Sequence, residues 1–200
     1  QILIIMSKTY CSVNRLYKDE YLAIETDRLR LAPIKAMDSS LVSDYFTINR
    51  AFHEKWSQTH GDDYFTSKAQ RSYLKADAKS YSQGRLLPFW IFEKSNHNRI
   101  LGRVSLFNFA FGGMMSCTIG YHLDKEYTSK GYMTEAVNAI VDFAFEELNI
   151  HRIEAYVMPD NGASIRLLER CGFQSEGLKH SYMHINGKWE DHLAYYLLNP

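Results

Sequence analysis

The clearest periodic pattern in the chain is an apolar stripe between Gly131 and Leu148. Its members recur at the three- and four-residue spacing of one helix face: Met133, Val137, Ile140, Val141, Ala144 and Leu148. That spacing predicts an amphipathic helix over residues 131–148.

Weaker patterns predict three further helices, over residues 38–50, 68–83 and 163–170. Asp38 or Ser39 would cap the first of these and Asn161 the last, because short polar side chains accept from the free N–H groups of a first helical turn. Gly172 follows the last helix at the position where a left-handed residue often ends one.

Apolar, alternating or aromatic-rich runs predict strands over residues 28–32, 86–93, 100–107, 117–123, 151–158, 178–185 and 188–198. Strands and helices are interleaved, so the fold class is a mixed α/β domain. No linker or repeat interrupts residues 21–200, and we expect them to form a single domain. Residues 1–20 are an N-terminal extension to which we assign no role.

Asn186-Gly187 lies between the last two strands, and an Asn-Gly pair in this position predicts a two-residue hairpin turn. A turn of that length pairs the strands residue by residue outward from the turn. We therefore expect Tyr182 to face Asp191 and Ser181 to face His192.

Composition narrows the functional classes. The chain is 46% hydrophobic and carries 23 basic and 23 acidic side chains, so its net charge is zero. A neutral balance argues against nucleic acid or an anionic membrane as the partner. The three cysteines contain no CxxC pair, which favours a reducing cytoplasm over a disulfide framework or zinc site.

A strand, a polar loop and a helix follow one another over residues 119–134, IGYHLDKEYTSKGYMT. The first N–H groups of a helix have no partner inside it, and the helix dipole leaves partial positive charge there. A loop leading into such an end can bind a pyrophosphate, and Gly131 would let the backbone approach it closely. Many strand–helix turns share these features and bind nothing.

The same stretch resembles the acyl-CoA loop of the GCN5-related N-acetyltransferases, whose pattern is Gln/Arg-x-x-Gly-x-Gly/Ala. Its three slots fall on Glu126, Ser129 and Gly131, of which Gly131 matches. The run from Asn161 to Phe173 resembles a segment of the subgroup that acetylates ribosomal-protein N-termini. Further similar residues occur at 26–31, 49–50, 131–136 and 186–187.

The resemblance implies a mostly antiparallel sheet, splayed between two parallel strands near 117–123 and 152–158, with helices on both faces. Acetyl-CoA is the implied cofactor, with its pantetheine in the gap and its pyrophosphate at 126–131. A backbone N–H near His122 or Leu123, at a bulge, would polarise the thioester carbonyl. The implied cofactor-binding residues are His122, Leu123, Glu126, Ser129, Lys130, Gly131, Tyr132, Met133, Thr134, Asn161 and Ser164.

Asn161 and Ser164 are the side chains that the resemblance places on the cofactor. Asn161 would bond the pantetheine amides, and Ser164 would donate a proton to the departing thiolate, directly or through water. Many relatives use a tyrosine for that proton, but its slot is Leu168 here, which leaves Ser164 as the candidate acid. The alternative role for both residues is that of ordinary helix-start residues.

The family's two usual glutamate bases are absent, because their slots hold Thr118 and Met183. His122 is one candidate base, and the rate would then rise through a pKa of about 6.5. Tyr182 relaying a proton with Asp191 is a second candidate, and a water chain is a third. The alternatives are that His122 is a structural histidine, and that Tyr182 and Asp191 form a cross-strand pair that only stabilises the hairpin.

The resemblance implies an N-acetyltransferase in which the acceptor amine attacks acetyl-CoA directly while both are bound. The expected acceptor is a protein N-terminal amine, with residues 50–79 walling its cleft. The alternatives are a small-molecule amine as the acceptor, or a non-catalytic acyl-CoA-binding module. No metal site is expected, since His180 and His184 would be roughly 13 Å apart on a strand. A homodimer is left open.

Overall fold

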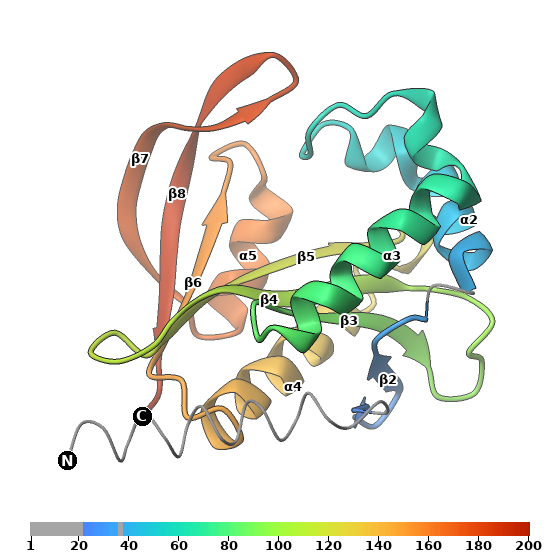
Figure 1. Ribbon diagram of the computed structural model, residues 1–200. Helices are drawn as coiled ribbons and strands as arrows, with labels where there is room; N and C mark the ends of the chain where they lie inside the picture. The colour runs from blue at the N-terminus through green and yellow to red at the C-terminus, as the bar shows by residue number, and fades with distance from the viewer. Residues whose placement is uncertain (1–21, 36–37) are drawn as a thin grey trace.

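The computed structural model describes residues 22–35 and 38–200, so the extension over 1–20 lies outside the described residues. Within them one sheet runs in the order β1-β2-β3-β4-β5-β6-β8-β7 (Figure 1). The strands are β1 (Ile24–Glu25), β2 (Leu29–Ala32), β3 (Leu86–Glu93), β4 (Gly102–Ala110), β5 (Ser116–Leu123), β6 (Arg152–Val157), β7 (Gln174–Ile185) and β8 (Lys188–Leu198).

The α-helices are α2 (Ser39–His53), α3 (Ser67–Ser82), α4 (Tyr132–Glu146) and α5 (Gly162–Arg170), and the short 3-10 helices are η2 (Asp62–Phe65) and η3 (Lys125–Tyr127). Adjacent strands of the sheet are antiparallel except β5 and β6. The predicted mixed α/β fold, with a mostly antiparallel sheet, is therefore confirmed.

Alternate residues of β3 supply two hydrophobic cores, one on each face of the sheet. Trp90 and Phe92 pack with Leu74 of α3, whereas Phe89 and Ile91 belong to the larger core that includes α4. Successive strand side chains point to opposite faces, so a strand buried on both sides is apolar along its whole length. Helices accordingly cover both faces (Figure 1).

Helix α4 buries the stripe seen in the sequence, and Val137, Ile140 and Ala144 are completely shielded from solvent. Each large apolar side chain buried in this way contributes about 1.5–3 kcal/mol. The helix begins at Tyr132, with Gly131 as its N-cap. This packing holds the start of α4 at one end of the sheet, immediately after β5.

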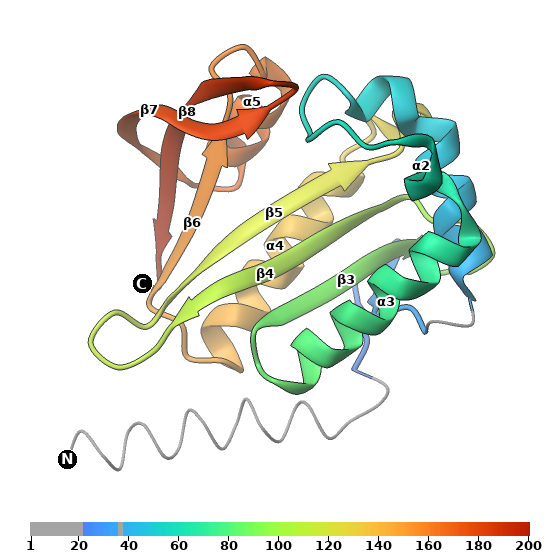
Figure 2. The ribbon, with the colours of Figure 1, turned by 45° about the horizontal axis from the view of Figure 1, so that its top comes forward.

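The parallel strands β5 and β6 are paired over only three residues each, Ser116–Thr118 with Arg152–Glu154. Beyond that point β5 runs on to Leu123 beside β4, and β6 runs on to Val157 beside β8. Figure 2 shows the two strands diverging. The predicted splay is confirmed, and the facing edges of both strands carry backbone groups that this sheet does not pair.

The bulge predicted near His122 or Leu123 is not there. The β4–β5 ladder is regular from Gly102↔Leu123 to Phe107↔Thr118, and its irregularity lies beyond Phe107. Asn108 has the positive φ of 53° that marks this bulge. The distortion therefore lies at the opposite end of β5, where the strand meets β6.

The predicted register of the last hairpin is wrong beyond Met183. Pairing is residue by residue from Ile185↔Lys188 to Met183↔Glu190, but it then shifts, so that Lys179 rather than Ser181 faces His192. Ser181 has a φ of 47° and bulges out of the strand. The offset is two residues, because β7 has three residues, 180–182, where β8 has only Asp191.

Asp191 stabilises that bulge instead of pairing with Tyr182. Its carboxylate accepts from the backbone N–H of Ser181 at 2.7 Å and contacts Nδ1 of His180 at 3.1 Å. The ring of Tyr182 packs against Tyr156. Tyr182 and Asp191 therefore do not form the predicted cross-strand pair.

The other predicted elements are present, with small changes at their ends. β7 begins at Gln174 rather than at residue 178, and Asp38 precedes α2 without a side-chain capping bond. Asn161 caps α5 as predicted, and Gly172 follows it with a φ of 84°. In the described part of the chain, no helix is both long and apolar enough to cross a bilayer.

Gly102→Ala is expected to destabilise the fold by about 1–3 kcal/mol, because overpacking carries a cost of this size. A Cβ at Gly102 would overlap the backbone carbonyl oxygen of His122. Gly113→Ala is the matched control, since nothing lies within 4 Å of a Cβ there. Denaturant unfolding measures both variants, and equal stabilities would contradict the close approach of β4 and β5.

Candidate active site

The loop between β5 and α4 is shaped to expose backbone N–H groups. Ser129 and Gly131 both have left-handed φ values, 60° and 79°, and the N–H of Glu135 bonds the Gly131 carbonyl at 3.0 Å. The N–H groups of residues 132–134 are the ones that helix geometry leaves without an intrahelical acceptor. Together with the helix dipole, they form an end suited to a diphosphate.

Ser129 stands where the family pattern has glycine, and it adopts the left-handed conformation that glycine would favour. For a non-glycine residue this costs roughly 1–2 kcal/mol. The loop therefore keeps the backbone shape of the pattern despite the substitution.

Arg28 of the β1–β2 turn holds the loop from the outside. Its guanidinium donates to the Lys130 carbonyl at 3.1 Å, pairs with Glu135 at 2.7 Å, and lies 4.5 Å from the Tyr132 ring centroid. Its Nη2 lies 3.4 Å from where a Cβ on Gly131 would be. No sequence motif links Arg28 to this loop.

Glu126 occupies the slot where the pattern has a cation or an amide. Arg99, from the β3–β4 connection, binds the Glu126 carboxylate and also Asp124 at 3.3 Å. The buried Asp124 in turn accepts from the Glu126 N–H at 2.9 Å. Arg99 thus pairs with the carboxylate at the slot where the family pattern has a cation or an amide, and the motif comparison missed it.

The side chains of other predicted loop residues contact the protein itself. Met133 is 6% exposed, with its side chain in the core, and the Thr134 hydroxyl accepts from Arg170 at 3.3 Å. Lys130 lies over the Tyr127 ring, 4.9 Å from its centroid.

The start of α5 brings two hydroxyl groups together. Asn161 accepts from the Ser164 N–H at 3.1 Å through Oδ1, and Ser164 Oγ lies 2.7 Å from the hydroxyl of Tyr121 on β5. Burial raises the pKa of Tyr121, so its phenol stays protonated at neutral pH. Sequence reasoning missed Tyr121, because its contact with Ser164 spans 43 residues. Leu168 is 1% exposed and packed in the core.

His122 lies on the other face of β5, against α2. Its Nδ1 is 2.7 Å from the Tyr45 hydroxyl, and its ring lies 5.2 Å from that of His53. Burial, His53 and Arg103 together hold the pKa of His122 well below its usual value of 6.5. His122 is therefore neutral at pH 7, and the expected pKa of about 6.5 is too high.

His53 Nε2 donates to the carbonyl of Leu123 at 2.8 Å. The next residue, Asp124, donates its N–H to Leu101 on the β4 side. Because successive strand residues point their N–H and C=O groups to opposite edges, those of Leu123 face the splayed gap. The predicted backbone donor at Leu123 therefore points toward the gap from a regular strand rather than from a bulge.

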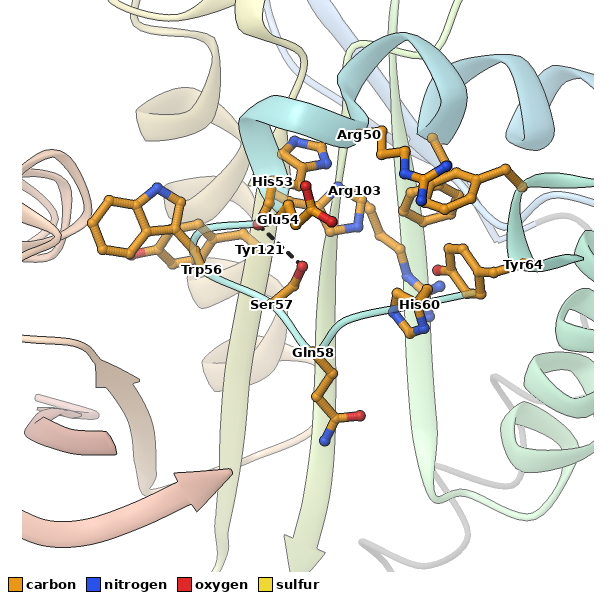
Figure 3. Close-up of a pocket in the computed structure, with 13 residues that line it drawn as sticks. Arg50, His53, Glu54, Trp56, Ser57, Gln58, His60, Tyr64, Arg103 and Tyr121 are labelled. Atoms are coloured by element: carbon orange, nitrogen blue, oxygen red, sulfur yellow. Dashed lines mark hydrogen bonds between the residues drawn. The ribbon is translucent and has the colours of Figure 1, made fainter. Parts of the chain in front are cut away.

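A cavity of about 300 Å³ lies beside these groups, between α2, the loop that follows it and β5 (Figure 3). Tyr121 and His122 line it together with aromatic side chains of α2, the loop and η2. Its two arginines are ion-paired, Arg50 with Asp62 at 2.8 Å and Arg103 with Asp77 at 2.9 Å. Much of its wall falls within residues 50–79, whereas Tyr182 is not among the lining residues.

Residues 28–174 match the family described as the acetyltransferase (GNAT) domain. The chain belongs to the GNAT acetyltransferase family. It is 42% identical over 168 residues to the probable N-acetyltransferase YjcK of Bacillus subtilis (strain 168), a match that covers 84% of this chain and 92% of YjcK.

Two further matches are a relative named for a ribosomal protein and a solved structure. The ribosomal protein uS5-alanine N-acetyltransferase of Escherichia coli (strain K12) is 30% identical over 177 residues, 88% of this chain and 91% of that protein. Mycobacterium smegmatis RimJ, solved in complex with CoA-disulfide, superposes with a TM-score of 0.81 at 26% identity, covering 89% of this chain and 86% of RimJ.

As a GNAT protein, the chain is an acetyl-CoA-dependent N-acetyltransferase. Its residues fit the co-substrate. The left-handed loop and the first N–H groups of α4 offer donors to a diphosphate, and the unpaired edges of β5 and β6 offer backbone groups to pantetheine.

Gly131→Asp is expected to weaken acetyl-CoA binding at least tenfold, or about 1.4 kcal/mol, because it places a negative side chain at the diphosphate end of α4. Gly112→Asp is the matched control. Gly112 has nearly the same φ, 77°, but lies in the β4–β5 connection with nothing within 4 Å. Calorimetry on both folded variants measures the effect, and equal affinities would remove the loop from the site.

Proposed function

We propose that this enzyme acetylates the N-terminal amine of a protein, as in the ribosomal-protein-alanine type, by direct attack within a ternary complex. Residues 21–200 act as one acetyltransferase domain, and cysteine usage favours the cytoplasm as its location. Similarity to the uS5-alanine enzyme along most of the chain supports this acceptor class.

One observation carries the proposal: the cavity reaches Tyr121 and His122 together. These neighbouring residues project to opposite faces of β5 at the point where it has parted from β6. An amine in the cavity therefore has an imidazole on one side and the Tyr121–Ser164 hydroxyl pair on the other. Acetyl-CoA supplies the activated thioester, and alignment of the two substrates provides much of the acceleration.

His122 takes the proton from the amine. To do so it carries its own proton on Nδ1, where the Tyr45 oxygen accepts it, and presents Nε2 to the cavity. Burial raises the pKa of Tyr45 well above its usual value, so this partner stays a neutral phenol. The N–H of Leu123 stabilises the developing oxyanion.

Ser164 returns a proton to the sulfur as the carbon–sulfur bond breaks, and the amide and the free CoA thiol are the products. Its hydroxyl is weakly acidic by itself, but the bond from Tyr121 lets the phenol donate to Ser164 as Ser164 donates to sulfur. Solvent then restores the phenol proton and accepts the proton that His122 took, so the net transfer is from nitrogen to sulfur.

The acceptor class is tested by measuring CoA release with a peptide that begins with alanine. The same peptide blocked by an N-terminal formyl group is the control, and spermidine represents small amines. Release with the free peptide alone is expected. Release with spermidine alone would favour a small-molecule acceptor, and binding of acetyl-CoA without any release would favour a binding module.

Ser164→Ala is expected to lower turnover on the order of a hundredfold, the low end for general acid catalysis, with acetyl-CoA affinity unchanged. The cap at Asn161 survives, since it uses the Ser164 backbone N–H. Tyr121→Phe should lower turnover as well, and the double variant should be no slower than the slower single one. Ser72→Ala, in α3, is the helix-serine control; turnover retained in Ser164→Ala would exclude the serine as the acid.

The kcat/KM of the wild-type enzyme is expected to rise with pH through a midpoint below 6.5, because His122 must be unprotonated and its pKa is lowered. His122→Gln should abolish this limb. His97→Gln, an exposed histidine in the β3–β4 connection, should retain it. Persistence of the limb in His122→Gln would assign the base to another group or to a water chain.

A further inference from the structure

The turn between β7 and β8 is tied to the loop that follows α2. The Asn186 side chain accepts from the Thr59 hydroxyl at 2.6 Å through Oδ1 and donates to the Glu54 carbonyl at 2.7 Å through Nδ2. These contacts join segments 127 and 132 residues apart in the sequence. The hairpin tip and the loop lie side by side in both ribbon views (Figures 1 and 2).

The tie requires asparagine. Asn186 and Gly187 have φ values of 49° and 81°, and asparagine is one of the few side chains that tolerate the left-handed region. The two contacts also need one acceptor and one donor at the same distance along a single side chain. Aspartate has the first without the second, and glycine has neither.

The turn itself does not depend on the tie. Ile185 pairs with Lys188 directly across it, and two more residue pairs follow, so the hairpin closes through its own strands. The Glu54 carbonyl lies just after α2, where helix geometry leaves acceptors unused. The two bonds of the Asn186 amide therefore hold the loop after α2, and the turn does not need them to form.

The loop that is held in this way forms a wall of the cavity. Glu54, Trp56, Ser57, Gln58 and His60 all line it. Asn186 is not among the lining residues, and it contacts this wall at both ends of residues 54–59.

We infer that Asn186 is an acceptor-positioning residue, which holds the 54–60 wall so that the amine is aligned with the acetyl group. The inference rests on the proposed function. The co-substrate binds at the other elements, α4, α5 and the splayed edges, so loss of the tie should affect the acceptor and leave acetyl-CoA binding intact.

The test compares Asn186→Gly and Asn186→Asp with the wild-type enzyme, using the peptide that begins with alanine. Asn186→Gly keeps the turn and removes both bonds, and the KM for the peptide should rise about tenfold, the value of two neutral hydrogen bonds. Asn186→Asp keeps the acceptor for Thr59 and should raise it less. Turnover at saturating peptide and the dissociation constant for acetyl-CoA should stay within about twofold of wild type.

The control is Asn149→Gly. Asn149 is exposed in the α4–β6 connection and has a φ of 54°, so this variant makes the same chemical change in a similar backbone conformation. Thr59→Val removes one bond from the loop side. Adding it to Asn186→Gly should cause no further rise in KM, because the shared bond is already gone.

Amide hydrogen exchange gives a readout that does not depend on catalysis. Exchange over residues 54–60 should be faster in Asn186→Gly than in wild type and Asn149→Gly. An unchanged rate there, or an unchanged peptide KM, would overturn the inference. A parallel loss of acetyl-CoA affinity and turnover would overturn it too, by showing a general structural role. Wild-type enzyme that acetylates no peptide, with exchange still altered, would instead locate the failure in the proposed acceptor class.

Discussion

Strands β5 and β6 share only three residue pairs, and the chemistry described above depends on this short contact. Each strand is held along its outer edge by an antiparallel neighbour, β4 or β8, so the two can separate without losing their order. The separation leaves backbone groups available in a gap with rigid walls. Such groups are costly to bury without partners, which is why a ligand that bonds like an added strand suits this gap.

The groups of the candidate site lie on both faces of the sheet. On one face, α4 and α5 present a helix start and the Tyr121–Ser164 pair. On the other, the smaller core under α2 and α3 holds His122 against Tyr45. Because side chains alternate along a strand, the consecutive residues Tyr121 and His122 lie on opposite faces of β5, as the proposed acid and base require.

The electrostatic potential around the site is set by local ion pairs between arginines and carboxylates rather than by the net charge of the chain. Arg99 pairs with the Glu126 carboxylate in the loop between β5 and α4, and Arg28 contacts that loop from outside. In the cavity the arginines are paired and burial keeps His122 neutral. An amine that enters the cavity meets little fixed positive charge. A cationic wall would favour the neutral, nucleophilic form of the amine more strongly, but it would also repel the protonated amine before it binds.

Local pattern alone determined the α4 helix, most strand positions, the Asn161 cap and the hairpin turn, because each depends on residues within a few positions of one another. The resemblance to a known family predicted the splay of β5 and β6 and assigned the diphosphate to the loop at 126–131. Only the tertiary structure decided the Ser181 bulge, the regular ladder at His122, and the contacts of Tyr121, Arg99 and Asn186. These features depend on contacts between segments that are far apart in the sequence. Periodicity and spacing along the chain carry no information about how closely such segments approach one another.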